Sequence, residues 1–431
     1  MNKNSEVAML VFKPLKQKRK NNSFDGNGNV GAMVIKELLE RKNIDVTFCS
    51  PQTAKNYKIV LVSLTSSYDI LSFYKQVHKL CEWKREVRKF HVCCGGFGMQ
   101  NPTAIREFID TAVFGRGEGI IEPLVQSILD NKTYEHQSIM RLPDITSVNI
   151  NQHNNLLDLI CYKESFTGCP NKCLFCNYSW SRVSTGNEFG YVQSSLTNNF
   201  TSPELTWKQM MLWDNKIGRG RSAIDGFSQR LRFAFGKTIT NQDIIDGINH
   251  RGSFEGNTVL TVYNIGNMPT ENKNDLIELE DVLKKCDPQN RVVVVVHTTP
   301  FRPSPATPMQ WAEAKLIPSF HKVGGKFFCD RDNLQLCHSR GNESAYSHLQ
   351  TLVVERATVE SDKLFHALAT NNKLNGLRKL DAIRAIKKNF DLSSYLRRYD
   401  IGDEPTWFLE SYTSKKKMWS LWDAGLKKAN G

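Results

Sequence analysis

Strand and helix signals alternate through the first 130 residues, and this alternation constrains the fold more than any other feature of the chain. Short apolar runs suited to buried strands occupy residues 7–12, 45–50, 58–64, 90–96 and 111–119. Segments with apolar residues at helical spacing lie between them, as at 29–42 and 68–83. This order predicts an α/β domain, a doubly wound, Rossmann-like parallel sheet of five strands.

Glycine-containing or small polar loops follow several of these expected strands. Their sequences are DGNGN, SLTSS, CCGGFG and GRGEG, the last three at 63–67, 93–98 and 115–119. In an open parallel sheet, ligands bind outside the carboxyl ends of the strands. We therefore expect a ligand site where these loops meet.

The 431-residue chain is long enough for further domains. A strong buried strand at 291–301 follows helical patterns at 241–250 and 274–286, so strand–helix repetition resumes and a (β/α) partial barrel is the simplest prediction. We expect four parts: an N-terminal domain at 1–130, a polar linker at 131–159, the partial barrel at 160–330, and a mostly helical C-terminal region at 331–431.

Three cysteines lie close together in the segment CPNKCLFC, as Cys169, Cys173 and Cys176. The chain has 11 cysteines, and most others are isolated and expected in cores, namely Cys49, Cys81, Cys286, Cys329 and Cys337. A structural zinc site needs four ligands, usually in two pairs. Zinc therefore requires a distant fourth ligand, for which His153, His250 and His297 are available. Three thiolates also suit three irons of a [4Fe–4S] cluster, with the fourth iron open to a substrate or cofactor.

The spacing C-x-x-x-C-x-aromatic-C, with Phe175 as the aromatic residue, resembles the signature of the radical S-adenosylmethionine (SAM) superfamily. The resemblance implies that the open iron binds SAM and that the reduced cluster cleaves it to a 5′-deoxyadenosyl radical. It also implies a reductant that is similar to flavodoxin or ferredoxin. Phe175 would then pack beside the adenine, and the backbone around Tyr178 would contact it.

Three later segments resemble the same superfamily in the same order. In AIDGFSQRLRFAFGKTITNQDI, the resemblance places Asp225 at the SAM ribose with Ser228 nearby. In VYNIGNMPTEN, Gly266, Pro269 and Glu271 stand at the matching positions of a cofactor-binding loop. TTPFRPSPATPMQW resembles a late-barrel segment of the branch with an N-terminal cobalamin-binding domain. The Gly-Gly-Glu that many members use for the SAM amino group is missing between 180 and 220.

The N-terminal domain also resembles a cobalamin-binding domain. The matching positions are Ser63 and Thr65 after the third strand, Gly95 and Gly96 after the fourth, and Arg116 and Glu118 in GRGEG after the fifth. Glycines there would let the corrin ring or its nucleotide tail approach the backbone. The Asp-x-His-x-x-Gly loop of cobalamin domains is missing, so a related domain that no longer binds a ligand is the alternative.

Taken together, these patterns predict a radical SAM enzyme, with cobalamin-dependent C-methylation or a related C–H functionalisation as the leading reaction. The alternatives are a radical SAM enzyme without cobalamin that rearranges its substrate or modifies a base, an RNA methylthiotransferase, and a non-enzymatic zinc or nucleic-acid-binding protein. The formal net charge of +13 suits a nucleotide or nucleic-acid substrate, or simply a solvated basic surface.

No run of eighteen apolar residues occurs, and the first twenty residues lack the long apolar stretch of a signal peptide. We expect a soluble, cytoplasmic protein that does not associate with membranes.

Overall fold

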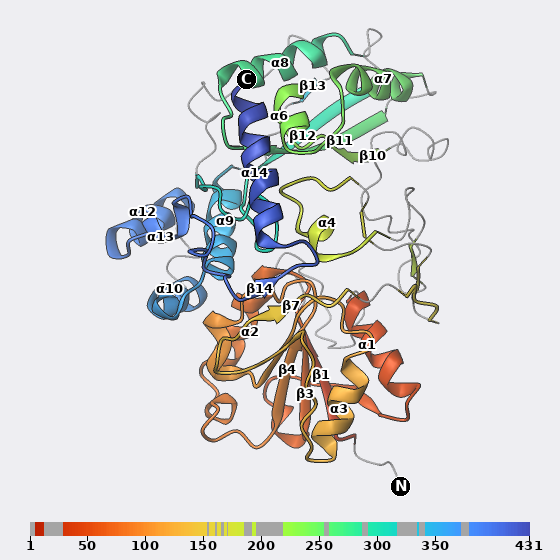
Figure 1. Ribbon diagram of the computed structural model, residues 1–431, viewed down its shortest axis with the longest axis vertical. Helices are drawn as coiled ribbons and strands as arrows, with labels where there is room; N and C mark the ends of the chain where they lie inside the picture. The colour runs from red at the N-terminus through yellow and green to blue at the C-terminus, as the bar shows by residue number, and fades with distance from the viewer. Residues whose placement is uncertain are drawn as a thin grey trace.

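The computed structural model describes residues 5–12, 29–152, 155–159, 162–164, 168–169, 171–184, 192–194, 219–253, 258–286, 292–316, 334–335, 341–371 and 379–431. Two largely parallel sheets lie at opposite ends of the long axis, and the helix α14 (Lys415–Asn430) runs along that axis from beside the second sheet toward the first (Figure 1). Several sequence expectations fall outside the described residues, among them most of the DGNGN loop and His153, Cys329 and Cys337.

The N-terminal sheet has the order β2-β1-β3-β4-β5-β6. Its strands are β1 (Val7–Val11), β2 (Val46–Phe48), β3 (Ile59–Ser63), β4 (His91–Gly95), β5 (Thr111–Val113) and β6 (Ile139–Arg141). The first five pair in parallel, whereas β6 is antiparallel to β5. The predicted α/β fold is confirmed, with one correction: part of the segment predicted to be a linker adds a sixth strand at the edge.

Helices cover both faces of this sheet because successive strand residues point to opposite sides. Val7 and Met9 pack into the core beneath α1 (Val30–Glu40) and α3 (Ile121–Leu129). Leu10, on the other face, packs into the core beneath α2 (Ser67–Val77). The helix expected at 68–83 ends earlier, and residues 81–83 form a 3-10 turn.

The second sheet has the order β10-β11-β12-β13, with every described pair parallel. Its strands are β10 (Arg219–Ala223), β11 (Thr258–Gly266), β12 (Val292–Pro300) and β13 (Leu334–Gln335). The associated helices are α6 (Gln229–Ala234), α7 (Asn241–Gly252) and α8 (Lys273–Lys284). Capping boxes set the starts of α7 and α8, through Thr240 with Asp243 and Asn272 with Asp275. The two helices bury one face of the sheet in a shared apolar core.

The strand before the cysteines lies within the predicted barrel segment but pairs with a different strand. β8 (Tyr162–Glu164) pairs antiparallel with β9 (Val192–Ser194), and in the described parts of the chain it is not joined to the four-stranded sheet. The cysteines follow it and lead directly into the short helix α4 (Asn177–Ser181). Within the described residues, the parallel part of the expected barrel is therefore four strands.

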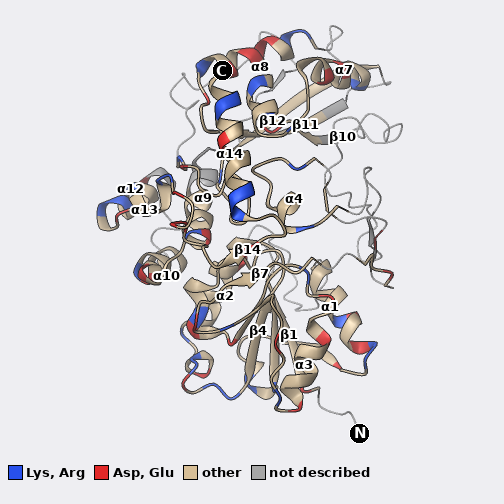
Figure 2. Ribbon diagram, viewed as in Figure 1, with Lys and Arg blue, Asp and Glu red and all other residues tan. Residues whose placement is uncertain are grey.

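The C-terminal region is mainly helical and packs on both sheets. Its helices are α9 (Gly341–Glu355), α10 (Asp362–Thr370), α12 (Lys379–Asn389), α13 (Ser393–Leu396) and α14 (Lys415–Asn430). β14 (Leu409–Glu410) pairs in parallel with β7 (Val148–Asn149), which ties this region to the segment after the N-terminal sheet. Basic and acidic residues are interspersed over these helices in the view of Figure 2. No helix in the described ranges has the length and apolar character needed to cross a membrane.

Candidate functional site

The three predicted cysteines lie together in one loop, residues 169–176, which we call the cysteine loop. Cys169 and Cys173 are buried, Cys176 is half-buried, and none of the three forms a disulfide. The Cys176 amide donates to the Cys173 carbonyl at 3.1 Å, which curls the loop before α4 begins. The same short turn therefore presents the second and third cysteines, as a common ligand requires.

The cysteine loop is held in place from its own backbone and from the C-terminal region. Trp180 donates its indole N–H to the Cys173 carbonyl at 2.8 Å. The Lys172 ammonium donates to the Ser179 carbonyl at 2.7 Å and to the Tyr412 hydroxyl. These bonds fix the loop through backbone carbonyls and a lysine side chain.

Charged groups surround the second cysteine. Burial raises the pKa of the Cys173 thiol well above its ordinary value, and the nearby Lys237 ammonium opposes this rise. Asp225 and the two other cysteines raise it further. A bound metal overrides such a rise, because a coordinating thiol is deprotonated outright. The interactions also show that the three cysteines, Asp225 and Lys237 lie near one another.

Asp225, the predicted ribose contact, follows β10 and adopts a left-handed backbone conformation with φ of 51°. Its carboxylate forms a 2.8 Å ion pair with Lys237, and both side chains are almost fully buried. The segment before Lys237 touches the cysteine loop, since the Phe235 carbonyl accepts from the Leu174 amide at 2.9 Å. Lys237 belongs to the segment that resembles the superfamily, but its sequence predicted no role for this lysine.

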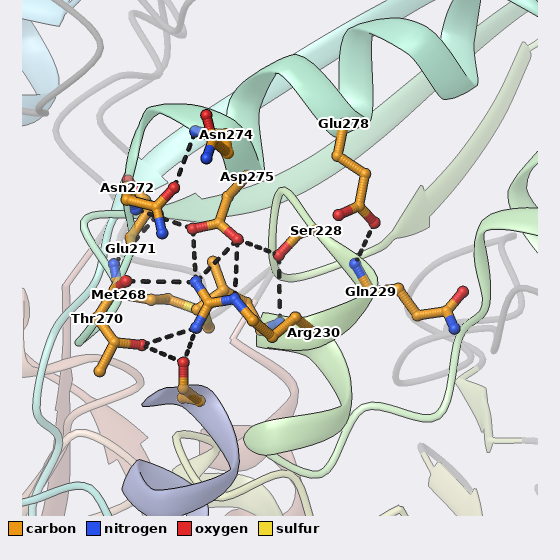
Figure 3. Close-up of polar contacts among 12 residues, drawn as sticks. Ser228, Gln229, Arg230, Met268, Thr270, Glu271, Asn272, Asn274, Asp275 and Glu278 are labelled. Atoms are coloured by element: carbon orange, nitrogen blue, oxygen red, sulfur yellow. Dashed lines mark hydrogen bonds and ion pairs between the residues drawn. The ribbon is translucent and has the colours of Figure 1, made fainter. Parts of the chain in front are cut away.

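Ser228, predicted to lie near SAM, is fully buried and belongs to a polar network shown in Figure 3. Its hydroxyl donates to Asp275 at 2.5 Å and caps α6. Arg230 donates to the same carboxylate from Nη2, at 2.7 and 2.8 Å, and from Nε at 3.3 Å, and it also contacts Thr270 and the Ala429 carbonyl. These contacts favour structural roles for Ser228 and Arg230, while contact with SAM stays a prediction.

The loop after β11 is shaped by Glu271, one of the residues matched by resemblance. Its carboxylate accepts from the Asn267 and Met268 amides at 2.9 and 3.3 Å. Gly266 ends the strand opposite Pro300 and its carbonyl accepts from Phe301. A role for Gly266 in cofactor binding stays a prediction.

Phe175, expected beside the adenine, is half-buried. It packs against a core shared by α6, α14 and the segment after β12, which includes Trp311 and Trp422. The cysteine loop thus rests on the C-terminal helix as well as on the second sheet, and contact between Phe175 and an adenine stays a prediction.

The carboxyl ends of β1, β3, β4 and β5 open on a pocket of about 420 Å³, which we call the N-terminal pocket. The predicted residues among its lining are Ser63, Thr65, Gly95, Gly96, Arg116, Glu118 and Tyr178. Gly96 has φ of 106°, and a Cβ there would lie 2.4 Å from the Leu64 carbonyl oxygen, so glycine is required. Apolar side chains such as Val34, Leu61 and Ile121 form much of the wall.

The polar end of this pocket is a buried ion triad. The Arg116 guanidinium lies 3.2 Å from Glu118 and 2.9 Å from Glu164, at the end of β8. Burial alone would lower the pKa of Arg116, but the two carboxylates outweigh burial and raise it. Glu164 was not predicted as a site residue, because nothing in its local sequence indicates that it pairs with Arg116, 48 positions earlier.

Two residues from the cysteine side complete the pocket. Tyr178 and Arg182 follow Cys176 in sequence, yet both line the pocket of the N-terminal domain. The sequence predicted only that the backbone around Tyr178 contacts the adenine, and it did not indicate Arg182. Within the described residues, no group of three or more His, Cys, Asp or Glu side chains converges as a single metal ion requires.

The sequence matches no protein-family model and no curated protein. Among solved structures, similarity is found to the cobalamin-dependent S-adenosylmethionine radical enzyme OxsB with aqua-cobalamin and S-adenosylmethionine bound, at 10% identity and a TM-score of 0.27. The same enzyme with aqua-cobalamin alone matches at 10% identity and a TM-score of 0.27, and its selenomethionine-labelled apo form matches at 11% identity and a TM-score of 0.26. The matches cover 93% of this chain but only 59–60% of OxsB. TM-scores this low do not establish a shared fold.

Proposed function

We propose that this chain is a radical SAM enzyme in which Cys169, Cys173 and Cys176 hold a [4Fe–4S] cluster. The observation that carries the proposal is the position of the cysteine loop. On one side it meets the buried Asp225–Lys237 pair, and on the other it leads directly into Tyr178 and the N-terminal pocket. Three cysteines at this junction suit a cluster that acts between two bound molecules.

The donor set fits an iron–sulfur cluster. Thiolates are the usual ligands of such clusters, and in a cubane each binds a different iron, so the three sulfurs need not converge on one ion. When bound, the reduced cluster supplies the electron that breaks a carbon–sulfur bond of SAM and yields the 5′-deoxyadenosyl radical. The buried loop keeps bulk water from this position, since Cys169 and Cys173 are only 6% and 5% exposed.

Asp225 and Lys237 would bind SAM beside the cluster. The Asp225 carboxylate can accept hydrogen bonds from the ribose hydroxyls, and the hydrogen bond from Lys237 holds it in place. The ammonium also places a positive charge near the cysteine loop, where it would attract the carboxylate of SAM.

The N-terminal pocket would hold part of a cobalamin, and the proposed reaction is methyl transfer to an unactivated carbon or a related C–H functionalisation. A volume of about 420 Å³ is typical of a cofactor site, and it suits one portion of so large a molecule, such as the nucleotide tail. Apolar walls and the close backbone at Gly96 suit a flat aromatic group. A one-electron reductant is the partner that this chemistry requires.

Metal content tests the proposal first. The protein is purified without oxygen from cells supplied with iron and cobalamin, and iron, cobalt and zinc are measured per chain. About four irons are expected, with cobalt near one if the pocket holds cobalamin. Iron without cobalt would retain the radical enzyme and reject cobalamin, whereas zinc in place of iron would reject the proposal.

Cysteine variants separate the cluster from the fold. Alanine at any of the three positions should abolish iron binding and the reductant-driven formation of 5′-deoxyadenosine from SAM. Cys81→Ala, at an exposed cysteine of the N-terminal domain, is the matched control and should retain both. A triple variant that still forms 5′-deoxyadenosine would exclude the assigned ligands.

Asp225→Ala tests the SAM contact separately. We expect SAM binding to weaken by about tenfold, the loss of one charge-assisted hydrogen bond, with iron content unchanged. Equilibrium binding of SAM to the iron-loaded protein provides the measurement. Unchanged affinity would refute the ribose assignment without affecting the cysteines.

A further inference from the structure

Two side chains connect the cysteine loop to the pocket of the other domain. Tyr178 and Arg182 lie in and just after α4, whose N-cap is Cys176, yet their side chains line the N-terminal pocket. Most of the remaining wall comes from the N-terminal domain. A molecule in the pocket must therefore touch a segment that begins at the third cysteine.

These side chains present flat surfaces to the pocket. The Arg182 guanidinium carbon lies 4.9 Å from the centre of the Tyr178 ring. The Phe97 ring, in the loop after Gly96, lies 6.4 Å from that ring at a tilted angle and is 42% exposed. Tyr178 thus stands between a cation and a second aromatic ring, and planar groups stack favourably in such surroundings.

The position of Tyr178 is linked to that of the cysteines through the backbone. Ser179, the next residue, donates its amide to the Cys176 carbonyl at 3.1 Å. The Ser179 carbonyl in turn accepts from the Lys172 ammonium, which precedes Cys173. A displacement of the Tyr178 ring therefore acts on a turn that is bonded to both sides of the Cys173–Cys176 segment.

We propose that Tyr178 is a positioning residue that couples occupancy of the N-terminal pocket to the state of the cysteine loop. A planar group in the pocket stacks on the Tyr178 ring and fixes α4, which in turn orders the cysteines for their ligand. Coupling between two sites is reciprocal, so a filled cysteine site must strengthen pocket binding by the same factor. This inference rests on the proposed function, because it assumes that both sites are used.

The test measures pocket affinity with and without the cluster. Hydroxocobalamin, as the probe, is titrated by absorbance into full-length protein that is either iron-loaded or iron-free. We expect about tenfold tighter binding to the iron-loaded form, within the usual range for coupled sites. Tyr178→Ala should remove that difference, and Tyr178→Phe, which keeps the ring, should restore most of it. Tyr134→Ala, at a half-buried tyrosine that packs against the core of the N-terminal sheet outside the pocket, should retain the difference.

The outcomes separate this inference from the proposed function. Tight cobalamin binding with no difference between the two forms, or with a difference that Tyr178→Ala retains, overturns the coupling and leaves the function intact. Absent cobalamin binding rejects cobalamin, and the coupling is then judged by the rate at which air bleaches the iron-loaded protein. Tyr178→Ala should bleach faster than wild type, because the turn that carries Cys173 and Cys176 loses its support, and Tyr134→Ala should bleach at the wild-type rate. Equal rates in all three overturn the inference.

Discussion

The two α/β units of this chain carry different kinds of side chains at the carboxyl ends of their strands. In the N-terminal domain, the carboxyl ends of the strands open on a pocket walled by apolar side chains and close-approaching backbone. At the second sheet, the strand ends carry polar side chains that already pair with one another, as in Asp225 with Lys237 and Ser228 with Asp275. The first unit is shaped for a bulky flat molecule, whereas the second places fixed charges beside the cysteines.

This difference fits the proposed function, in which the first unit binds cobalamin and the second binds SAM and the cluster. An apolar pocket binds by area and shape, and it tolerates changes in its walls. Buried ion pairs act through position and charge, and removal of one partner leaves an uncompensated charge. Substitutions should therefore have graded effects in the first unit and abrupt effects in the second.

The largest effect is expected from Cys173→Ala, which should remove the iron entirely and with it SAM cleavage. The pocket lies in the other unit, so cobalamin should still bind, about tenfold more weakly if the two sites are coupled. Iron analysis and cobalamin titration of the same sample provide the measurement. Complete loss of cobalamin binding in a folded variant would show that the two units are one site.

The sequence predicted the N-terminal sheet well because its signals are local. Buried runs and glycine loops determine strand positions and the ligand edge, and the residues matched by resemblance to a cobalamin-binding domain line one pocket. The site as a whole was less predictable, because its decisive contacts join distant parts of the chain. Glu164 pairs with Arg116, and Tyr178 reaches the N-terminal domain, through tertiary packing that no local pattern encodes. The edge strand β6 was missed for a similar reason, since its three residues carry little periodicity.

Arg116→Met tests whether the first unit is as tolerant as the comparison implies. Arg116 is the exception there, because it is buried between two carboxylates. Its removal should lower the free energy of unfolding by about 3–5 kcal/mol, the usual cost of a broken buried pair, and should weaken cobalamin binding. Arg384→Met removes a surface ion pair and should cost at most about 1 kcal/mol. Chemical denaturation followed by circular dichroism compares the free energies of unfolding of the two variants. If both lose the same amount, Arg116 contributes no more to stability than a surface ion pair.

Gly425→Val tests how far the cysteine side depends on the C-terminal helix. A Cβ at Gly425 would lie 3.0 Å from both the Ala234 carbonyl oxygen and the Leu174 side chain, beside Cys173. Overpacking there should cost about 1–3 kcal/mol and reduce iron content, while pocket affinity in the iron-free protein stays near wild type. Ala424→Val, at the exposed neighbouring position of α14, is the control. If both variants bind the same amount of iron, packing of α14 does not support the cysteine loop.

The smallest effect concerns the region that joins the two units. His348 of α9 is 93% buried, and no hydrogen-bond partner of its Nε2 is found in the described structure. Burial, together with the positive charges of Arg302 and Arg356, lowers the pKa of this imidazole to about 3. The folded protein therefore keeps His348 neutral at pH values where the unfolded chain has bound a proton.

The sign of the resulting pH dependence follows from proton linkage. Between about pH 6.5 and pH 3 the unfolded state carries one more proton at this position, so stability falls by up to about 1.4 kcal/mol for each pH unit of acidification. Above about pH 6.5 the imidazole is neutral in both states and contributes no slope. We expect His348→Gln to lose about 1 kcal/mol less than wild type between about pH 6 and pH 5, as measured by urea denaturation. His366→Gln, at an exposed histidine of α10, should follow wild type. If His348→Gln also follows wild type, the acid sensitivity does not arise from this histidine.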